Sequence, residues 1–398
     1  MKKKLLVITS SFPKWSGDDT IPFVYELSKR LVEDFEVTVL APHCPNSKRK
    51  EKFDNIEVYR FRYFFERFEK LACAGGILPV LRRNKLYYFV IPFFLLGLFW
   101  ALIKQVRKDR PDIIHAHWII PQGLMAALIK KIYKIPYVVT AHGSDVFGLK
   151  GKWFNSIKLV ALKNASKITV VSSAIKNEII KKIDSNLKIE VVSMGVDAEY
   201  FTPDKKDNTI RNSYSINGGV FLLFVGRLSP EKGLNYLLNA MPDIIGKFPK
   251  TKLLIIGEGT LKQEMQELAG RLNLENNVIF LGQISNKELP KYYASADIFI
   301  NSSLREGLPV TVMEAMSCRC IPVVTDLEGN IDLIKDNITG FFVEQKNQRA
   351  ISQKIIELMS NPSLVVTVKS HIREEIISRF DWKIITNKYK NVLIQALV

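Results

Sequence analysis

Two cationic residues follow a buried strand in the second half of the chain. The segment Phe224–Gly233 reads as the end of an apolar strand, a glycine and a short turn that carries Arg227 and Lys232. Gly226 lets a ligand approach the backbone closely because it has no side chain. A guanidinium forks onto phosphate oxygens, and an ammonium adds a point charge. This spacing predicts a diphosphate clamp that needs no metal ion, with a solvated basic turn as the alternative.

A second motif supplies two carboxylates. Glu306 and Glu314 flank Gly307 and Pro309, which mark a tight turn into a helix after the expected strand Asp297–Ser302. The N-terminus of that helix points free N–H groups at an anion. Both carboxylates can accept hydrogen bonds from the hydroxyls of a sugar and a ribose. The alternative is a capping Glu306 and a surface Glu314, although the neighbours of Glu314 in the sequence are apolar.

Histidines lie at the ends of two expected strands in the first half. His142 follows the strand Tyr137–Ala141, whereas His115 and His117 share one face of the strand Asp112–His117. Ligands of open parallel sheets bind beyond the carboxyl ends of the strands, so we expect His142 to face a ligand. A satisfied core histidine is the alternative, and it weighs more for His117 and most for His115.

The elements that position these motifs follow one repeating pattern. Short runs rich in Val, Ile and Leu alternate with helical patterns, which indicates parallel strands buried on both faces. The expected strands are residues 4–10, 35–41, 56–61, 112–117, 137–141, 167–171 and 189–192, then 220–225, 252–256, 278–281, 298–300, 321–324 and 340–343. The predicted fold class is therefore α/β, with two doubly wound, Rossmann-like domains that face each other across a cleft.

The length of 398 residues also favours two domains. We expect residues 1–203 to form the first domain and residues 204–379 the second. The polar segment 204–219 reads as the linker region. An amphipathic helix over residues 380–398 is expected to pack back on the first domain.

Composition limits the classes of function. With 57 Lys and Arg against 40 Asp and Glu, the chain carries a net charge of +17, which attracts polyanions. It has no zinc-finger spacing and no basic-aromatic RNA-binding signature, so nucleic acid is not an expected partner. The four cysteines, Cys44, Cys73, Cys318 and Cys320, are expected to be reduced thiols of a cytoplasmic protein.

One apolar segment has the length of a membrane span. Residues 86–103 contain no charge, and basic residues flank both ends. Pro92 and Gly97 interrupt the segment, which falls inside the alternating strand and helix pattern. We therefore expect a helix buried in, or lying on, the first domain. The alternatives are interfacial contact with an anionic membrane, as in a monotopic enzyme, and a true span.

The two motifs of the second half together resemble glycosyltransferase family 4. The resemblance is carried by Gly226-Arg227-x4-Lys232-Gly233 and Glu306-x7-Glu314, and it extends to Pro111–His117 and Phe380–Trp382. That family consists of retaining, metal-independent enzymes with the GT-B fold. Membership would imply a nucleotide-sugar donor and no cofactor.

The resemblance also implies roles for individual residues. Arg227 and Lys232 would hold the donor diphosphate, Glu314 the ribose, and Glu306 the transferred sugar. The implied donor-binding residues are Gly226, Arg227, Lys232, Glu258, Gln283, Glu306, Gly307, Leu308, Val310, Thr311 and Glu314. His142 would lie near the reacting carbon, which makes His142, Glu306, Arg227 and Lys232 the expected catalytic residues.

The acceptor side departs from the family pattern. The family carries paired glycines in the first loop, whereas the loop Ser10–Asp19 offers only Gly17. The expected acceptor-side residues are Gly17, Asp18, His117 and Asp145. A proline, an aromatic residue and two acidic residues in the loop suggest a specialised acceptor.

The resemblance implies a retaining, metal-independent transferase that moves a sugar from a UDP- or GDP-sugar to a glycan or lipid-linked acceptor. No D-x-D element in a strand-ending loop supports a metal-bound diphosphate. We expect the protein in the cytoplasm, with the inner face of the membrane as a contact. Two alternatives remain open: a nucleotide-sugar 2-epimerase of the same fold, and a non-catalytic binding protein with a degenerate site.

Overall fold

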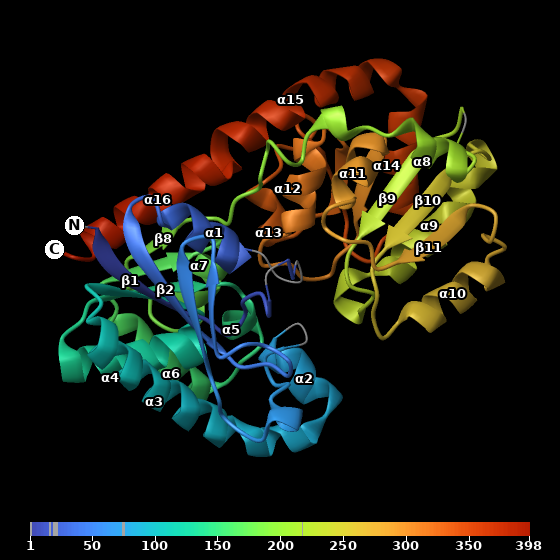
Figure 1. Cartoon of the computed structure of the whole chain (residues 1–398). Coiled ribbons are helices and arrows are strands. Elements are labelled where there is room, and N and C mark those ends of the chain that lie inside the picture. Colours follow the sequence, from blue (N-terminus) through green and yellow to red (C-terminus); the bar gives the residue numbers. More distant parts are fainter. Residues whose placement is uncertain (1, 16, 19–22, 74–75, 217) are drawn as a thin grey trace. The chain divides into compact units, whose positions relative to one another are not determined.

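The computed structural model describes residues 2–15, 17–18, 23–73, 76–216 and 218–398 (Figure 1). Contacts divide the chain into two units. The first unit comprises Met1–Met194 and Ile385–Val398, and the second comprises Gly195–Ile384. Each unit contains one sheet with helices packed on it.

The sheet of the first unit has the strand order β3-β4-β2-β1-β5-β6-β7-β8 within the described ranges. Every pair of neighbours is parallel except β3 and β4, which are antiparallel. The strands are β1 (Lys3–Ile8), β2 (Phe35–Pro42), β3 (Lys50–Phe53), β4 (Ile56–Phe61), β5 (Ile113–His117), β6 (Tyr137–Ala141), β7 (Lys167–Val170) and β8 (Ile189–Val191). The order reverses between β1 and β5, which places the loops after these two strands at a switch point.

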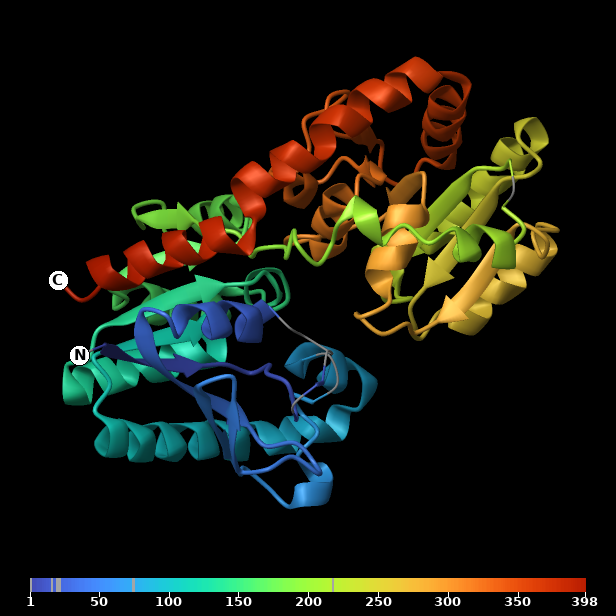
Figure 2. The same ribbon diagram turned by 45° about the horizontal axis from the view of Figure 1, so that its top comes forward.

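Helices cover this sheet, and the α-helices bury apolar side chains in the unit. Helix α3 packs against β2 and β4, and α4 packs against α6; Figure 2 shows the α3 side of the unit. The helices are α1 (Phe23–Leu31), α2 (Ile77–Arg83), α3 (Ile91–Asp109), α4 (Leu124–Tyr133), α5 (Ser144–Phe147), α6 (Lys152–Lys163) and α7 (Ser173–Lys182), with the short helices η1 (Glu66–Phe68), η2 (Lys85–Val90) and η3 (Ile119–Gly123).

The second unit has a parallel sheet of order β11-β10-β9-β12-β13-β14 among the residues described. This is the order of a six-stranded Rossmann sheet, and its switch point lies between β9 and β12. The strands are β9 (Phe221–Val225), β10 (Lys252–Ile256), β11 (Val278–Gly282), β12 (Ile298–Asn301), β13 (Ile321–Thr325) and β14 (Phe341–Val343). Most of their side chains are buried because helices cover both faces of the sheet, whereas the edge strand β11 is only partly buried after Val278.

The helices of the second unit occupy the connections between its strands. They are α8 (Asn208–Ser213), α9 (Leu234–Lys247), α10 (Lys262–Arg271), α11 (Leu289–Ser295), α12 (Val310–Ser317), α13 (Glu328–Ile331), α14 (Gln348–Ser360) and α15 (Pro362–Phe380), with the short helices η4 (Pro203–Lys205) and η5 (Pro230–Lys232). The final helix, α16 (Trp382–Gln395), leads from the second unit into the first. There the Tyr389 hydroxyl donates to the carbonyl of Val192 at 2.9 Å.

Every strand expected from the sequence is present, and the ends agree within two residues. Strand β3 was not expected, because its charged sequence lacks the apolar pattern of a buried strand. The expected linker segment, 204–219, contains helix α8 in the second unit, whereas the contact boundary falls between Met194 and Gly195. Arg211 of α8 pairs with Asp297 at 3.1 Å. Residue 217 lies outside the described ranges.

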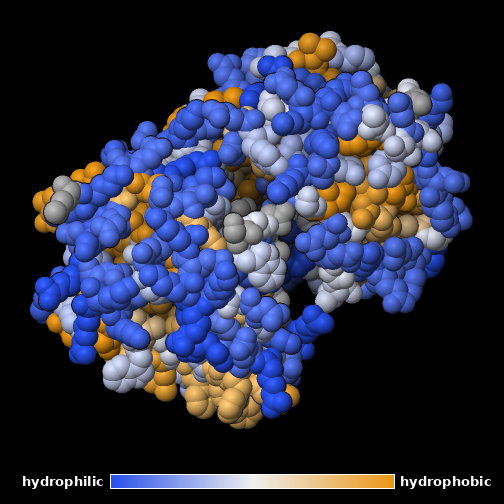
Figure 3. Space-filling view, viewed as in Figure 1, coloured by the Kyte–Doolittle hydropathy of each residue, from blue (hydrophilic) through white to orange (hydrophobic). Residues whose placement is uncertain are grey.

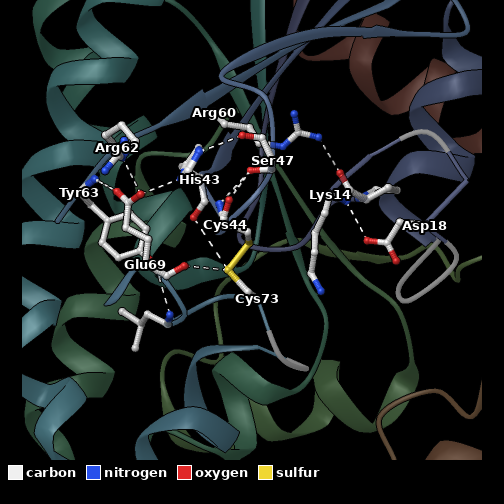
Figure 4. Close-up of a disulfide and its surroundings, with 12 residues drawn as sticks. Lys14, Asp18, His43, Cys44, Ser47, Arg60, Arg62, Tyr63, Glu69 and Cys73 are labelled. Carbon is white, nitrogen blue, oxygen red and sulfur yellow. Dashed lines mark hydrogen bonds and ion pairs between the residues drawn. A yellow bond between two sulfur atoms is a disulfide. The ribbon is translucent and has the colours of Figure 1, made fainter. Parts of the chain in front are cut away.

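The expectation of four reduced thiols is wrong for two of the cysteines. Cys44 and Cys73 form a disulfide in the first unit (Figure 4). Their spacing of 29 residues gives no sequence signal, because the pairing depends on how η1 folds back beside the end of β2. Cys318 and Cys320 are free and buried.

Candidate active site

The loops at the switch point of the second unit carry the predicted diphosphate clamp. Gly226–Lys232 follows β9, and the segment from Ser302 to Pro309 follows β12, the neighbouring strand. Parallel strands end at the same edge of the sheet, so both predicted motifs lie at that edge. The sequence placed each motif after its own strand, and the structure shows that these two strands are neighbours in the sheet.

Three glycines allow the neighbouring loops to approach one another. The Gly226 N–H donates to the Ile256 carbonyl at 3.0 Å, and the Gly257 N–H donates to the Gly282 carbonyl at 2.8 Å. Gly257 has φ of +137°, and a Cβ atom there would lie 1.9 Å from the Gly226 carbonyl oxygen. No side chain fits in that space, so the close backbone packing beneath the site requires glycine.

Lys232 and Glu306 form an ion pair between the two motifs. Lys232 Nζ lies 2.5 Å from Glu306 Oε1, which also accepts hydrogen bonds from the Ser303 hydroxyl at 2.6 Å and the Asn301 amide at 3.4 Å. Three donors on one oxygen fix the orientation of the carboxylate. All three donors contact Oε1, so the other carboxylate oxygen, Oε2, is the one that could accept a hydrogen bond from a ligand hydroxyl.

Gly233 fixes the turn that delivers Lys232. It has φ of +59°, and a Cβ atom would lie 2.2 Å from the Ser302 carbonyl oxygen. The Ser302 hydroxyl in turn donates to the Lys232 carbonyl at 3.0 Å. The β9 and β12 loops therefore hold each other through backbone contacts.

Other predicted donor residues follow the strands β9, β10 and β11. Arg227 is exposed at the carboxyl end of β9, and Gln283 is exposed directly after β11. Glu258 follows β10 and pairs with Lys262 at 2.6 Å. These side chains lie at the ends of three strands that are adjacent in the sheet.

The N-terminus of α12 lies beside the β12 loop. Pro309 is its N-cap residue, so the first helical residues are Val310 and Thr311. N–H groups in the first turn of a helix have no partner within the helix and carry a partial positive charge. Gly307 and Leu308 are partly exposed in the loop before it. This geometry suits an anion or a sugar oxygen.

Glu314 of α12 accepts a hydrogen bond from the Tyr293 hydroxyl at 2.9 Å. Burial raises the pKa of Glu314 to about 7, and the hydrogen bond from Tyr293 opposes that rise. Tyr293 itself is fully buried, and burial with the neighbouring carboxylate raises its pKa. The Glu314 carboxylate therefore changes charge near neutral pH. Tyr293 was not predicted, because two adjacent tyrosines on a helix carry no motif.

The first unit brings three histidines together at the carboxyl ends of β5 and β6. His117 Nδ1 lies 2.9 Å from His142 Nε2, and the rings of His115 and His117 are 4.2 Å apart. Further down, His115 Nε2 lies 2.7 Å from the Thr140 hydroxyl. Burial lowers the pKa values of His115 and His142 to about 3 and that of His117 well below its usual range. All three rings are therefore neutral at pH 7, and His142 occupies the outer position at the strand ends.

Asp145 organises the loops beside these histidines. Its buried carboxylate accepts hydrogen bonds from the N–H groups of Ile119 at 2.7 Å, Gly143 at 3.0 Å and His142 at 3.3 Å. Burial raises its pKa, although these hydrogen bonds oppose the shift. Asp145, which was expected on the acceptor side, thus fixes the backbone of Ile119, His142 and Gly143.

The first loop is described only in part. Gly17 is exposed with φ of +89°, and the Asp18 carboxylate accepts a hydrogen bond from the Lys14 N–H at 2.8 Å. Ser16 and Asp19 of the same loop lie outside the described residues. Across the described part of the chain, no group of three His, Cys, Asp or Glu side chains is placed to hold a metal ion.

Two protein families match this chain, and both are families of glycosyltransferases. Residues 206–375 match the family "Glycosyl transferases group 1", and residues 22–200 match "Glycosyltransferase Family 4". An uncharacterized glycosyltransferase of Methanocaldococcus jannaschii is 30% identical over 347 residues, which cover 86% of this chain and 90% of the relative. The Escherichia coli UDP-Gal:alpha-D-GlcNAc-diphosphoundecaprenol alpha-1,3-galactosyltransferase is 28% identical, over 75% of this chain and 79% of its own.

Solved structures share the fold at lower identity. Sucrose-phosphate synthase from Thermosynechococcus elongatus superposes with a TM-score of 0.81 at 17% identity, over 99% of both chains. Anabaena HepE in complex with UDP has a TM-score of 0.77 at 18% identity, over 98% of this chain and 99% of its own. The family matches and the archaeal relative show that the chain belongs to glycosyltransferase family 4, and is an enzyme with the GT-B fold.

Proposed function

We propose that the enzyme transfers a sugar from a UDP- or GDP-sugar to a glycan or lipid-linked acceptor, with retention of configuration and without a metal ion. The observation that carries the proposal is the Lys232–Glu306 pair between the β9 and β12 loops, with exposed Arg227 on the same loop as Lys232. This arrangement offers cations for a diphosphate and an oriented carboxylate for a sugar.

The charge of the leaving group determines what the site must stabilise. When the bond between the sugar and the diphosphate breaks, negative charge grows on the phosphate oxygen. Arg227, Lys232 and the N–H groups of Val310 and Thr311 would stabilise that charge from fixed positions. Glu306 would orient the sugar through its Oε2 atom, because Oε1 already has three donors.

The histidines limit the possible acid–base chemistry. A side chain whose pKa is about 3, such as His142, is a weak base and stays neutral at pH 7. It can exchange hydrogen bonds with a sugar hydroxyl but cannot efficiently take the acceptor proton. In the proposed reaction the acceptor oxygen attacks the anomeric carbon, the sugar–phosphate bond breaks, and the acceptor proton passes to the leaving phosphate.

Two relatives indicate the class of acceptor. The name of the E. coli relative describes transfer to a sugar on diphosphoundecaprenol, and a Bacillus subtilis relative, 28% identical, is named a putative teichuronic acid biosynthesis glycosyltransferase. We therefore place the acceptor among lipid-linked or polymeric glycans. The proposed location is the cytoplasm, at the inner face of the membrane.

The test is a transfer assay in EDTA with a panel of UDP- and GDP-sugars and lipid-linked glycan acceptors. We expect release of one nucleoside diphosphate and a new glycoside whose NMR coupling shows the anomeric configuration of the donor. An inverted product would contradict retention, and loss of turnover in EDTA would contradict metal independence. A donor epimerised without acceptor would support the epimerase alternative, and binding without turnover would support a non-catalytic protein.

A further inference from the structure

The continuous helical segment formed by η2 and α3 is apolar on two opposite sides. The inner side is buried in the first unit and consists of Val90, Phe94, Leu98, Leu102 and Val106. The outer side is exposed and consists of Leu86, Phe89, Phe93, Leu96 and Trp100. The exposed fraction of Phe89 is 77% and that of Trp100 is 64%. Steps of three and four residues align the outer side chains along one stripe of the helix.

Helix η1 extends this stripe with more aromatic side chains. Phe65 and Phe68 are exposed, and both rings contact Phe64, whose ring lies 5.1 Å from that of Phe93. We call the exposed set Phe65, Phe68, Leu86, Phe89, Phe93, Leu96 and Trp100 the apolar face. Figure 3 shows hydrophobic side chains gathered along the lower edge of the view, where Figure 1 draws α3. Soluble proteins seldom expose so many large apolar side chains together.

Basic residues surround the apolar face. Exposed cations lie at both ends of the helical segment and beside η1: Arg82, Arg83, Lys85, Lys104, Arg107, Lys108, Arg67 and Lys70. Between residues 62 and 109 the acidic residues are Glu66, Glu69 and Asp109, and Asp109 lies 3.7 Å from Lys108. Glu69 is buried and pairs with His43 at 2.7 Å and Arg62 at 2.6 Å (Figure 4). The surroundings of the face are therefore strongly cationic.

The segment Lys85–Asp109 is long and apolar enough to cross a membrane, by length and composition alone. Its inner side, however, belongs to the core of the first unit. Gly97 packs on the β4 end so closely that a Cβ atom would lie 2.8 Å from the Arg62 carbonyl oxygen. A span would strip this side from the sheet and expose both surfaces. The fold therefore favours a helix that lies along a membrane surface over one that crosses it.

We propose that the apolar face docks onto an anionic lipid bilayer, with α3 in the plane of the interface. Aromatic and leucine side chains would enter the boundary between head groups and acyl chains, while the surrounding cations contact anionic head groups. A second protein copy would bury the apolar side chains equally well, but it would bring the same cations against one another. The inference deepens the acceptor half of the proposed function, since a docked enzyme reaches lipid-linked substrates.

The test measures binding of the full-length protein to vesicles, without any substrate. Vesicles of phosphatidylcholine alone are compared with vesicles that also contain phosphatidylglycerol, at physiological ionic strength. The double variant Phe89→Ser/Trp100→Ser removes two exposed side chains of the apolar face. The matched control, Val366→Ser/Ile338→Ser, removes two exposed apolar side chains of the second unit. Circular dichroism establishes that each variant is folded.

We expect wild-type protein to bind the anionic vesicles and carbonate to release it. Phe89→Ser/Trp100→Ser should weaken binding at least about tenfold, because each lost side chain removes buried apolar area, and the control should bind as wild type does. Equal binding by both double variants would overturn the proposal. So would failure of wild type to bind anionic vesicles, resistance to carbonate, or a concentration-dependent dimer that the double variant abolishes.

Failure of this inference is separable from failure of the proposed function. Arg227→Ala is expected to bind vesicles like wild type even though it loses transfer activity. Transfer to a water-soluble acceptor by wild type that ignores vesicles would refute docking alone. Vesicle binding without any transfer would leave docking intact and refute the proposed reaction.

Discussion

Replacing Tyr293 with phenylalanine tests whether Glu314 binds the donor ribose as a carboxylate. The Tyr293 hydroxyl donates to Glu314 at 2.9 Å and favours its charged form, while burial raises the pKa to about 7. Ribose hydroxyls donate hydrogen bonds most strongly to an ionised carboxylate. Nucleotide affinity should therefore fall as the pH falls below 7, and Tyr293→Phe should move that fall to higher pH.

The size of the shift follows from the lost hydrogen bond. A hydrogen bond to a charged group contributes about 1.5 to 3 kcal/mol, and one pKa unit corresponds to about 1.4 kcal/mol. We expect the pKa of Glu314 to rise by about one unit in Tyr293→Phe. At pH 7 the ionised fraction then falls from about one half to about one eleventh, so nucleotide affinity should drop about fivefold. Near pH 9 the two proteins should bind almost equally.

The assay is calorimetric titration with a nucleoside diphosphate across this pH range. The terminal phosphate of the ligand also titrates near pH 6, so the difference between proteins is the quantity that matters. Tyr292→Phe is the matched control, because it removes a hydroxyl from the neighbouring residue of α11 without touching Glu314. Glu314→Gln cannot ionise and should lose this part of the pH dependence.

Superimposable pH profiles for wild type and Tyr293→Phe would refute the reasoning about the hydrogen bond. Wild-type affinity and pH dependence in Glu314→Gln would go further, because they would remove Glu314 from the nucleotide site altogether.

Other predictions concern the same loops. Folding raises the pKa of Glu314 from its ordinary 4.5 to about 7, so the folded protein takes up a proton in this window and loses stability as the pH rises through it. In urea unfolding at pH 8, the free energy of unfolding of Glu314→Gln should exceed that of wild type by up to about 3 kcal/mol. At pH 4 the two free energies should be equal. Gly233→Ala should lower the free energy of unfolding by about 1 to 3 kcal/mol in the same assay. The control Gly246→Ala should not lower it, because the space around Gly246 is open. Equal stability of the two variants would contradict the strain argument. Lys232→Ala should lower kcat/KM, because it removes about 2 to 4 kcal/mol of transition-state stabilisation. Undiminished initial rates in this variant would show that Lys232 is not part of the clamp.

The sequence predicted the sheets well because parallel strands buried on both faces leave continuous apolar runs. Strands such as β6 and β10 agree with the expected bounds at both ends. Strand β3 was missed because an edge strand with the sequence Lys50–Phe53 carries charge where buried strands do not. Helix α8 was missed because its short polar sequence resembles a linker, and its ion pair with Asp297 is visible only in three dimensions.

The site was predicted as motifs but not as a network. Arg227, Lys232 and Glu306 came from local spacing, yet the ion pair between two of them depends on β9 lying beside β12. Contacts between segments far apart in the sequence, such as Tyr293 with Glu314, leave no local pattern. Asp145 was expected on the acceptor side, and only the structure shows its carboxylate bound to three backbone N–H groups.

The most direct test of the donor site is calorimetric titration of wild-type and Arg227→Ala protein with UDP and with GDP, in EDTA. The account predicts that wild type binds one of the two nucleotides without metal and that Arg227→Ala loses most of that affinity. Failure of folded wild type to bind either nucleotide, or equal affinity in the variant, would contradict the metal-free diphosphate clamp on which the proposed reaction depends.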